Sequence, residues 1–148
     1  MTSAERLAAL VGHPVPAEVF AYLSNYPAVL TAFHERLGFA SHERFLYPDL
    51  DTLLAQNEEV RAEDIWTEAG PWPADHLDVG ADISGDRFAL ALSESPPGVH
   101  RLHHDVGRFE RIAPTFQDYV AALERLACGE ARSLRDALAG LPSAPAGR

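Results

Sequence analysis

The chain has no lysine and a single cysteine. Its 12 basic side chains are all arginines and stand against 22 acidic ones, so the formal net charge is −10. This balance disfavours a sequence-independent nucleic-acid binder, which needs a basic surface. The lone cysteine, Cys128, excludes an internal disulfide and any zinc or iron–sulfur site made from several cysteines. We therefore expect a protein of the reducing cytoplasm, with Cys128 as a small buried apolar residue.

Long apolar runs and catalytic signatures are also missing. No 18 apolar residues follow one another, and the first residues, 1–6, lack the basic-then-apolar pattern of a signal peptide. We expect neither membrane insertion nor export. The chain also has no Gly-x-Ser-x-Gly elbow, phosphate-binding glycine loop or dinucleotide fingerprint. An enzyme is therefore disfavoured, and we predict no catalytic residue, no metal and no cofactor.

The 148 residues are 47% hydrophobic, which suits one globular domain. Apolar residues at helical spacing, interrupted at Gly12 and at 24–27, predict three short helices in the first third. The apolar-aromatic run 44–47 predicts a short strand. Asp49 or Asp51 then caps a helix with an acidic, water-facing side.

Between His76 and Ile112 the apolar period changes to two, which predicts strands. Turn sequences separate them, so the strands form an antiparallel meander. Thr115 next caps a helix whose apolar stripe is formed by Phe116, Tyr119, Val120, Leu123 and Leu126, and a short helix over 133–138 follows.

The fold class that follows is α+β: an antiparallel meander sheet packed against N-terminal and C-terminal helices. We predict a single domain over residues 1–140 and a flexible C-terminal tail over residues 141–148, which are rich in proline, alanine and glycine.

Several short motifs follow one another in order between residues 44 and 123. They are Leu46-Tyr47-Pro48, Trp72-Pro73, Leu77-Asp78-Val79-Gly80-Ala81-Asp82, Gly85-Asp86-Arg87-Phe88, Val99-His100-Arg101-Leu102 and Ile112-Ala113-Pro114-Thr115-Phe116. Their order and spacing resemble the SUKH superfamily, the Smi/Knr-like proteins. The resemblance implies a non-enzymatic binding protein: many bacterial members resemble immunity proteins that neutralise a toxin, often a nuclease, and fungal relatives are cell-wall synthesis regulators and scaffolds.

The acidic residues are concentrated in the segment 43–86, which holds twelve acids and two arginines, whereas the rest of the chain is balanced. One interpretation is a surface that occupies the phosphate-binding groove of a basic nuclease. The other is a solvated face that keeps the protein soluble. The residues that we expect to bind a protein partner are Glu58, Glu59, Glu63, Asp64, Asp82 and Asp86, with Trp66 as an anchor if it is exposed beside them. Trp72 is expected in the core.

Asp78, Asp82 and Asp86 recur every four residues, which would align three carboxylates on a helix. Glycines between them argue against a helix, so we expect these side chains to cap a turn rather than to bind Mg²⁺ or Ca²⁺.

A second cluster contains His100, His103 and His104. Neighbouring residues of a strand point to opposite faces, so a structural or solvent-facing role is favoured over a zinc site.

The sequence thus predicts a cytoplasmic, non-enzymatic protein-binding module. Its expected role is that of an immunity protein that neutralises a bacterial toxin, such as a nuclease, through an acidic surface. The alternatives are a stand-alone regulatory adaptor or scaffold similar to cell-wall synthesis regulators and, more remotely, a metal-dependent hydrolase. The expected partner is a toxin domain rather than a nucleic acid or a membrane.

Overall fold

The first third of the chain folds into three short helices, as the sequence predicts. The computed structural model describes residues 1–62, 65, 67–68 and 70–141, and the helices are α1 (Ser3–Val11), α2 (Ala17–Ser24) and α3 (Ala28–Arg36). The hydroxyl of Thr2 caps α1 by accepting a hydrogen bond from the Glu5 amide at 3.1 Å. Gly12 ends α1 with a φ of +68°, which glycine adopts without a Cβ clash.

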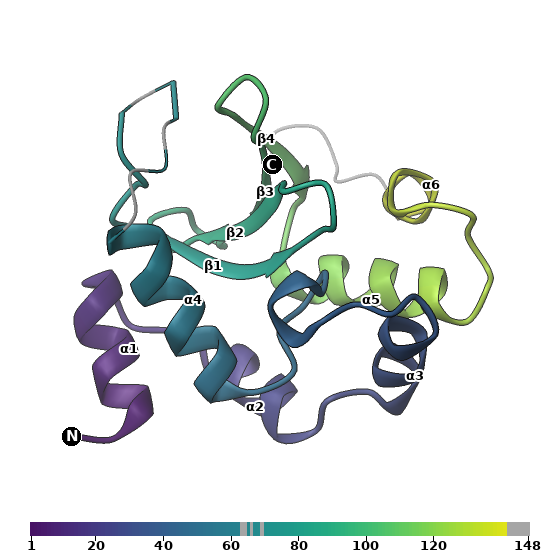
Figure 1. Ribbon diagram of the computed structural model, residues 1–148, viewed down its shortest axis with the longest axis horizontal. Helices are drawn as coiled ribbons and strands as arrows, with labels where there is room; N and C mark the ends of the chain where they lie inside the picture. The colour runs from purple at the N-terminus through teal and green to yellow at the C-terminus, as the bar shows by residue number, and fades with distance from the viewer. Residues whose placement is uncertain (63–64, 66, 69, 142–148) are drawn as a thin grey trace.

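Four strands form one antiparallel sheet in the order β1-β2-β3-β4 (Figure 1). Their bounds are β1 (His76–Ala81), β2 (Arg87–Ala91), β3 (Val99–His103) and β4 (Arg108–Ala113). Each strand pairs with the next one along the chain, so the predicted meander is confirmed. The register of β1 against β2 shifts between Asp78 and Gly80, which marks a bulge.

The run 44–47 is not a strand, contrary to the sequence prediction. It follows a single 3₁₀ turn, η1 (Ser41–Glu43), and lies along the outer edge of β1. Two backbone hydrogen bonds hold it there, from the Tyr47 amide to the Val79 carbonyl at 2.9 Å and from the Ala81 amide to the Arg44 carbonyl at 2.8 Å. A Cβ on Gly80 would lie 1.9 Å from a carbonyl oxygen of this run, so the close approach requires glycine.

Helix α4 (Leu50–Ala62) covers the β1 side of the sheet. Asp49 caps it: its carboxylate accepts a hydrogen bond from the Thr52 amide at 2.7 Å. Leu53 and Leu54 join the main hydrophobic core, whereas Val60 joins a second, smaller cluster. The helix therefore contributes to both clusters.

The closing helix α5 (Phe116–Ala127) begins at Thr115, whose hydroxyl accepts a hydrogen bond from the Asp118 amide at 3.1 Å. It packs beneath the sheet (Figure 1), and α6 (Leu134–Ala139) follows it. Cys128 is exposed, so the expectation of a buried cysteine is wrong. The reason is that α5 ends at Ala127 and Cys128 is its C-cap residue.

The main core lies between the sheet and the helices. Alternation along β2 sends Phe88 and Leu90 into this core, while Ala89 points to the opposite face and meets Trp72 in the second cluster. Trp72 is buried, as predicted. The fold is thus α+β: an antiparallel meander sheet has the large core on one face and the small cluster on the other.

The predicted tail, apart from Leu141, lies outside the described residues. Among the helices that the structure does describe, none is long and apolar enough to cross a membrane.

We expect Phe116→Ala to lower the free energy of unfolding by about 3–5 kcal/mol, because its ring is buried and the substitution leaves a cavity. The ring meets Tyr22 edge-on at 5.8 Å between centroids, which ties α5 to α2. Urea unfolding of this variant beside Gln117→Ala, an exposed neighbour on the same helix, measures the difference. Equal stability of the two variants would contradict the central place given to α5.

Candidate functional site

Of the predicted partner-binding residues, the four that the structure describes do not form one exposed acidic surface. Glu58 and Glu59 lie on α4, whereas Asp82 and Asp86 lie in and beside the turn that joins β1 to β2. The remaining three, Glu63, Asp64 and Trp66, lie outside the described residues.

The two groups lie on different elements that both contact β1. Arg61, in the last turn of α4, donates a hydrogen bond at 2.8 Å to the carbonyl of His76, the first residue of β1. Asp82 follows the last residue of the strand. Six extended residues span roughly 17 Å, so Asp82 lies far from the contact of Arg61 with His76. Glu59 lies nearer to the turn, because Gln56 donates to it at 3.0 Å and accepts from Arg87 at 3.3 Å, and Arg87 pairs with Ala81.

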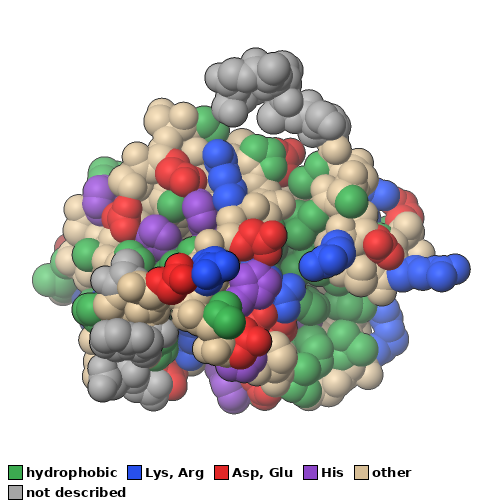
Figure 2. All heavy atoms as spheres, turned by 90° about the horizontal axis from the view of Figure 1, so that it is seen from above, with side chains coloured by type: hydrophobic (Ala, Val, Ile, Leu, Met, Phe, Trp, Pro, Cys, Tyr) green, Lys and Arg blue, Asp and Glu red, His purple; other side chains and the backbone are tan. Residues whose placement is uncertain are grey.

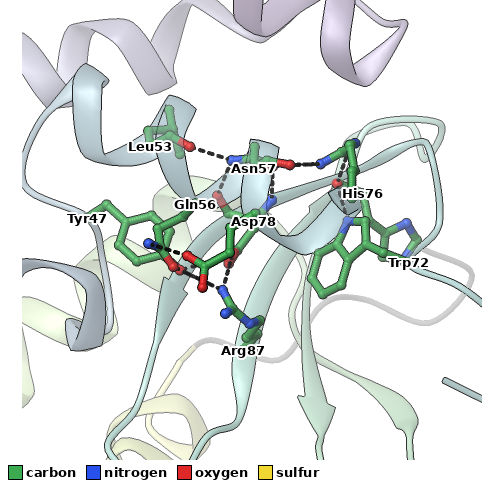
Figure 3. A network of polar contacts seen from close by, with 10 residues as sticks. Tyr47, Leu53, Gln56, Asn57, Trp72, His76, Asp78 and Arg87 are labelled. Carbon is green, nitrogen blue, oxygen red and sulfur yellow. Dashed lines mark hydrogen bonds and ion pairs between the residues drawn. The ribbon is translucent and has the colours of Figure 1, made fainter. Parts of the chain in front are cut away.

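A buried polar network fixes α4 on β1 (Figure 3). The fully buried amide of Asn57 donates to the carbonyl of Asp78 at 2.8 Å and accepts from the amide of Asp78 at 2.9 Å. It therefore satisfies both backbone groups of Asp78, as a neighbouring strand would. It also donates to the carbonyl of Leu53 at 2.8 Å, one turn earlier in α4.

The carboxylate of Asp78 belongs to the same network (Figure 3). Its Oδ2 atom accepts hydrogen bonds from Arg87 at 2.6 Å and from the hydroxyl of Tyr47 at 3.0 Å. Burial raises the pKa of Asp78 to about 7, although Arg87 and Tyr47 act in the opposite direction. These hydrogen bonds connect the run 44–47, β1 and β2. Because the side chain is fully buried, it is not accessible to a ligand at the surface.

The other two aspartates hold the hairpin turns. Oδ1 of Asp82 accepts hydrogen bonds from the amides of Ser84 at 2.9 Å and Asp86 at 3.1 Å, so the predicted turn capping is confirmed for Asp82. Its Oδ2 accepts from Arg101 at 2.9 Å. Asp86 accepts from Arg101 at 2.7 Å and from both the amide and the ring of His104. Arg101 and His104 thus lock the turn after β1 to the end of β3.

Asp86 is buried, so the expectation that its carboxylate reaches solvent as an interface acid is wrong. Burial raises its pKa, but the hydrogen bonds from His104 and Arg101 outweigh burial and lower the pKa to about 2. The sequence shows the charge of Asp86 but not its partners, which stand 15 and 18 residues further along the chain.

The histidines near the sheet pair with carboxylates. His76 lies 2.9 Å from Asp75, and His100 lies 3.0 Å from Glu94. His103 lies 2.8 Å from Glu110. Over the part of the chain that the structure describes, no three histidine, cysteine, aspartate or glutamate side chains are placed to hold a metal ion.

Free acidic charge is left on the outer side of α4. Asp51 and Glu58 stand two turns apart on this side and are exposed, and Glu59 is half-buried beside them. We call Asp51, Glu58 and Glu59 the α4 acidic face. Within the described residues, Glu58 makes the one ion pair of this face, with Arg6 at 3.2 Å, and both of these side chains are half exposed.

Sequence reasoning missed Asp51 as a surface acid because it was a candidate cap. The cap is Asp49, and the seven-residue spacing from Asp51 to Glu58 would have placed both on one helix side. On the face seen in Figure 2, which looks onto the molecule from the sheet side, acidic, basic and histidine side chains are interleaved.

No protein-family model matches the chain, and no curated protein or solved structure matches it.

We expect Asp86→Asn to cost about 2 kcal/mol of stability at pH 7, the equivalent of its pKa shift from 3.8 to about 2. The folded pKa lies below the unfolded one, so this contribution is complete above pH 4 and is lost as the pH falls towards 2. Urea unfolding at pH 7, 5, 4 and 3 should show the gap between wild type and variant narrowing at the lowest pH values. Asp105→Asn, in the exposed turn nearby, serves as the control with a change within about 0.5 kcal/mol. A gap that is the same at pH 3 and pH 7 would contradict the role given to the Asp86 carboxylate.

Proposed function

We propose that this protein is a non-enzymatic binding module that neutralises a basic protein partner, as an immunity protein neutralises a toxin such as a nuclease. The observation that carries this proposal is the α4 acidic face. Its three carboxylates lie within about two turns of one helix, and within the described residues Glu58 alone has an ion-pair partner, Arg6.

Most of the other acids of the segment 43–86 that the structure describes are compensated. Asp78 pairs with Arg87, and Asp82 and Asp86 share Arg101. Glu68 pairs with Arg108 at 2.9 Å, and Asp75 pairs with His76. Among the described residues of this segment, pairing inside the sheet and its turns therefore leaves the uncompensated negative charge on α4 and its cap Asp49, where it can attract a basic surface.

The α4 acidic face is also rigidly presented. Asn57 and Arg61, on the inner side of the same helix, bond to the backbone of β1. A surface that is already ordered loses little conformational entropy when it binds, so more of the interaction energy appears as affinity. Rigid presentation suits a protein that blocks its target by occupying it.

The resemblance of the motifs between residues 44 and 123 to SUKH proteins supports the same reading. That segment contains α4 and the whole sheet, and the family that it resembles includes toxin-neutralising immunity proteins. The resemblance supplies the class of function, and the α4 acidic face supplies the contact surface.

The test compares two variants of equal formal charge. The first neutralises the α4 acidic face with Asp51→Asn, Glu58→Gln and Glu59→Gln. The control neutralises three exposed acids on other elements, Asp105→Asn, Glu110→Gln and Glu130→Gln. Wild type and both variants are used to capture partners from a lysate of the source cells, and association rates with the captured protein are measured at 0.1 and 1 M salt.

We expect wild type and the control variant to capture the same basic protein, and the α4 variant to associate with it roughly tenfold more slowly. High salt should remove this difference, because the screening length falls from about 10 Å at 0.1 M to about 3 Å at 1 M. Equal association rates for the two variants would overturn the proposal. A partner that binds through α4 but is not toxic to cells would replace the immunity role by that of a regulatory adaptor.

A further inference from the structure

A second surface of different character lies away from α4. An open groove of about 620 Å³ runs between α3, α5 and the connection to α6. Its apolar lining residues are Phe33, Leu37, Phe39, Phe45, Leu126 and Leu134. Leu37 is 48% exposed, one of the most exposed large apolar side chains among the described residues. In Figure 1 these helices lie to the right of the sheet, and α1 and α4 lie to its left.

The floor of this groove is apolar and uncharged. His34 lies against three of the lining rings, with centroid distances of 5.6 Å to Phe33 and 6.0 Å to both Phe39 and Phe45. It is fully buried, and neither ring nitrogen has a hydrogen-bond partner among the described residues. Burial, helped by the charge of Arg44, lowers the pKa of His34 to about 4, so this imidazole is neutral at pH 7.

The charged residues on the lining are cationic. They are Arg36 and Arg132, and no described lining residue is acidic. Arg36 lies over the ring of Phe33 at 5.9 Å and donates a hydrogen bond to the carbonyl of Ala127 at 3.4 Å, which leaves most of its five N–H groups free. The nearest acid along the chain from Arg132, Glu130, lies 3.7 Å from Arg125.

We propose that this groove docks an apolar segment of a partner protein that carries an aspartate or glutamate side chain. Charge complementarity identifies the occupant, since two arginines border an apolar floor in a chain whose net charge is −10. Arginine binds carboxylates through paired N–H groups, and arginine beside aromatic rings is typical of interface hot spots. A small molecule would bury most of its surface in a closed pocket, whereas this groove is open to solvent, which favours a peptide segment.

This inference does not depend on the proposed function, because no residue of the α4 acidic face lines the groove. The two surfaces also prefer partners of opposite charge. A basic surface suits α4, and an acidic, apolar segment suits the groove.

The experiment selects peptides from a random 12-residue phage-displayed library on the wild-type protein. Synthetic copies of the enriched peptides are then titrated against Arg36→Gln/Arg132→Gln, which removes the rim charge, and against Leu37→Ser, which removes the exposed apolar contact. Arg135→Gln on α6 and Val106→Ser in the β3–β4 turn are matched controls, since both residues are exposed and lie outside the groove. Melting temperatures confirm that each variant is folded.

We expect enriched peptides that combine apolar residues with aspartate or glutamate. Their affinity should fall about tenfold or more for both groove variants and stay within twofold for both controls. Cys128, the single cysteine, lines the groove and is exposed, so bound peptide should slow its reaction with a thiol reagent.

Three outcomes would overturn the proposal: no enrichment, enrichment of peptides without acidic residues, or unchanged affinity for the two groove variants. Concentration-dependent self-association that Arg36→Gln/Arg132→Gln abolishes would also overturn it, because the occupant would then be a second copy of this chain.

Discussion

The side chain of Asn57 gives the outer strand β1 a hydrogen-bonding partner that is not a strand. Its amide bonds both the N–H and the C=O of Asp78, and the carboxylate of Asp78 in turn bonds Tyr47 and Arg87. Removing one member would leave a buried polar or charged group unpaired, which is strongly destabilising. This network fixes the rotation of α4, and with it the outward direction of the α4 acidic face.

The elements that the sequence predicted correctly depend on local signals. Thr2, Gly12 and Thr115 mark helix ends through contacts within a few residues, and alternation with turn sequences identified the meander. The prediction of a strand over 44–47 was wrong. The apolar pattern of this run fits a strand, but its geometry is set by the close approach to Gly80, far along the chain. A local pattern carries no information about such a contact.

The candidate site was harder to predict for the same reason. The excess of acids was visible in the sequence, but their partners Arg87 and Arg101 are supplied by strand pairing, which turns three of the acids into structural groups. Asn57 carries no sequence signal that separates it from the exposed residues of its helix. What remains after pairing is an acidic helix face at one end and an arginine-bordered apolar groove at the other. Two surfaces of opposite character fit the binding role proposed above.

The central claim is that, among the described residues of the segment 43–86, the negative charge without an ion-pair partner lies on α4 and at its cap, Asp49, and forms a binding surface. Chemical-shift mapping by NMR with hexalysine as a probe tests it without a natural partner. The shifts should be largest at Asp51, Glu58, Glu59 and the neighbouring turn of α1, and they should vanish at 1 M salt, where the screening length is about 3 Å. Shifts of equal size at the turns around Asp82 and Asp105 would contradict the claim.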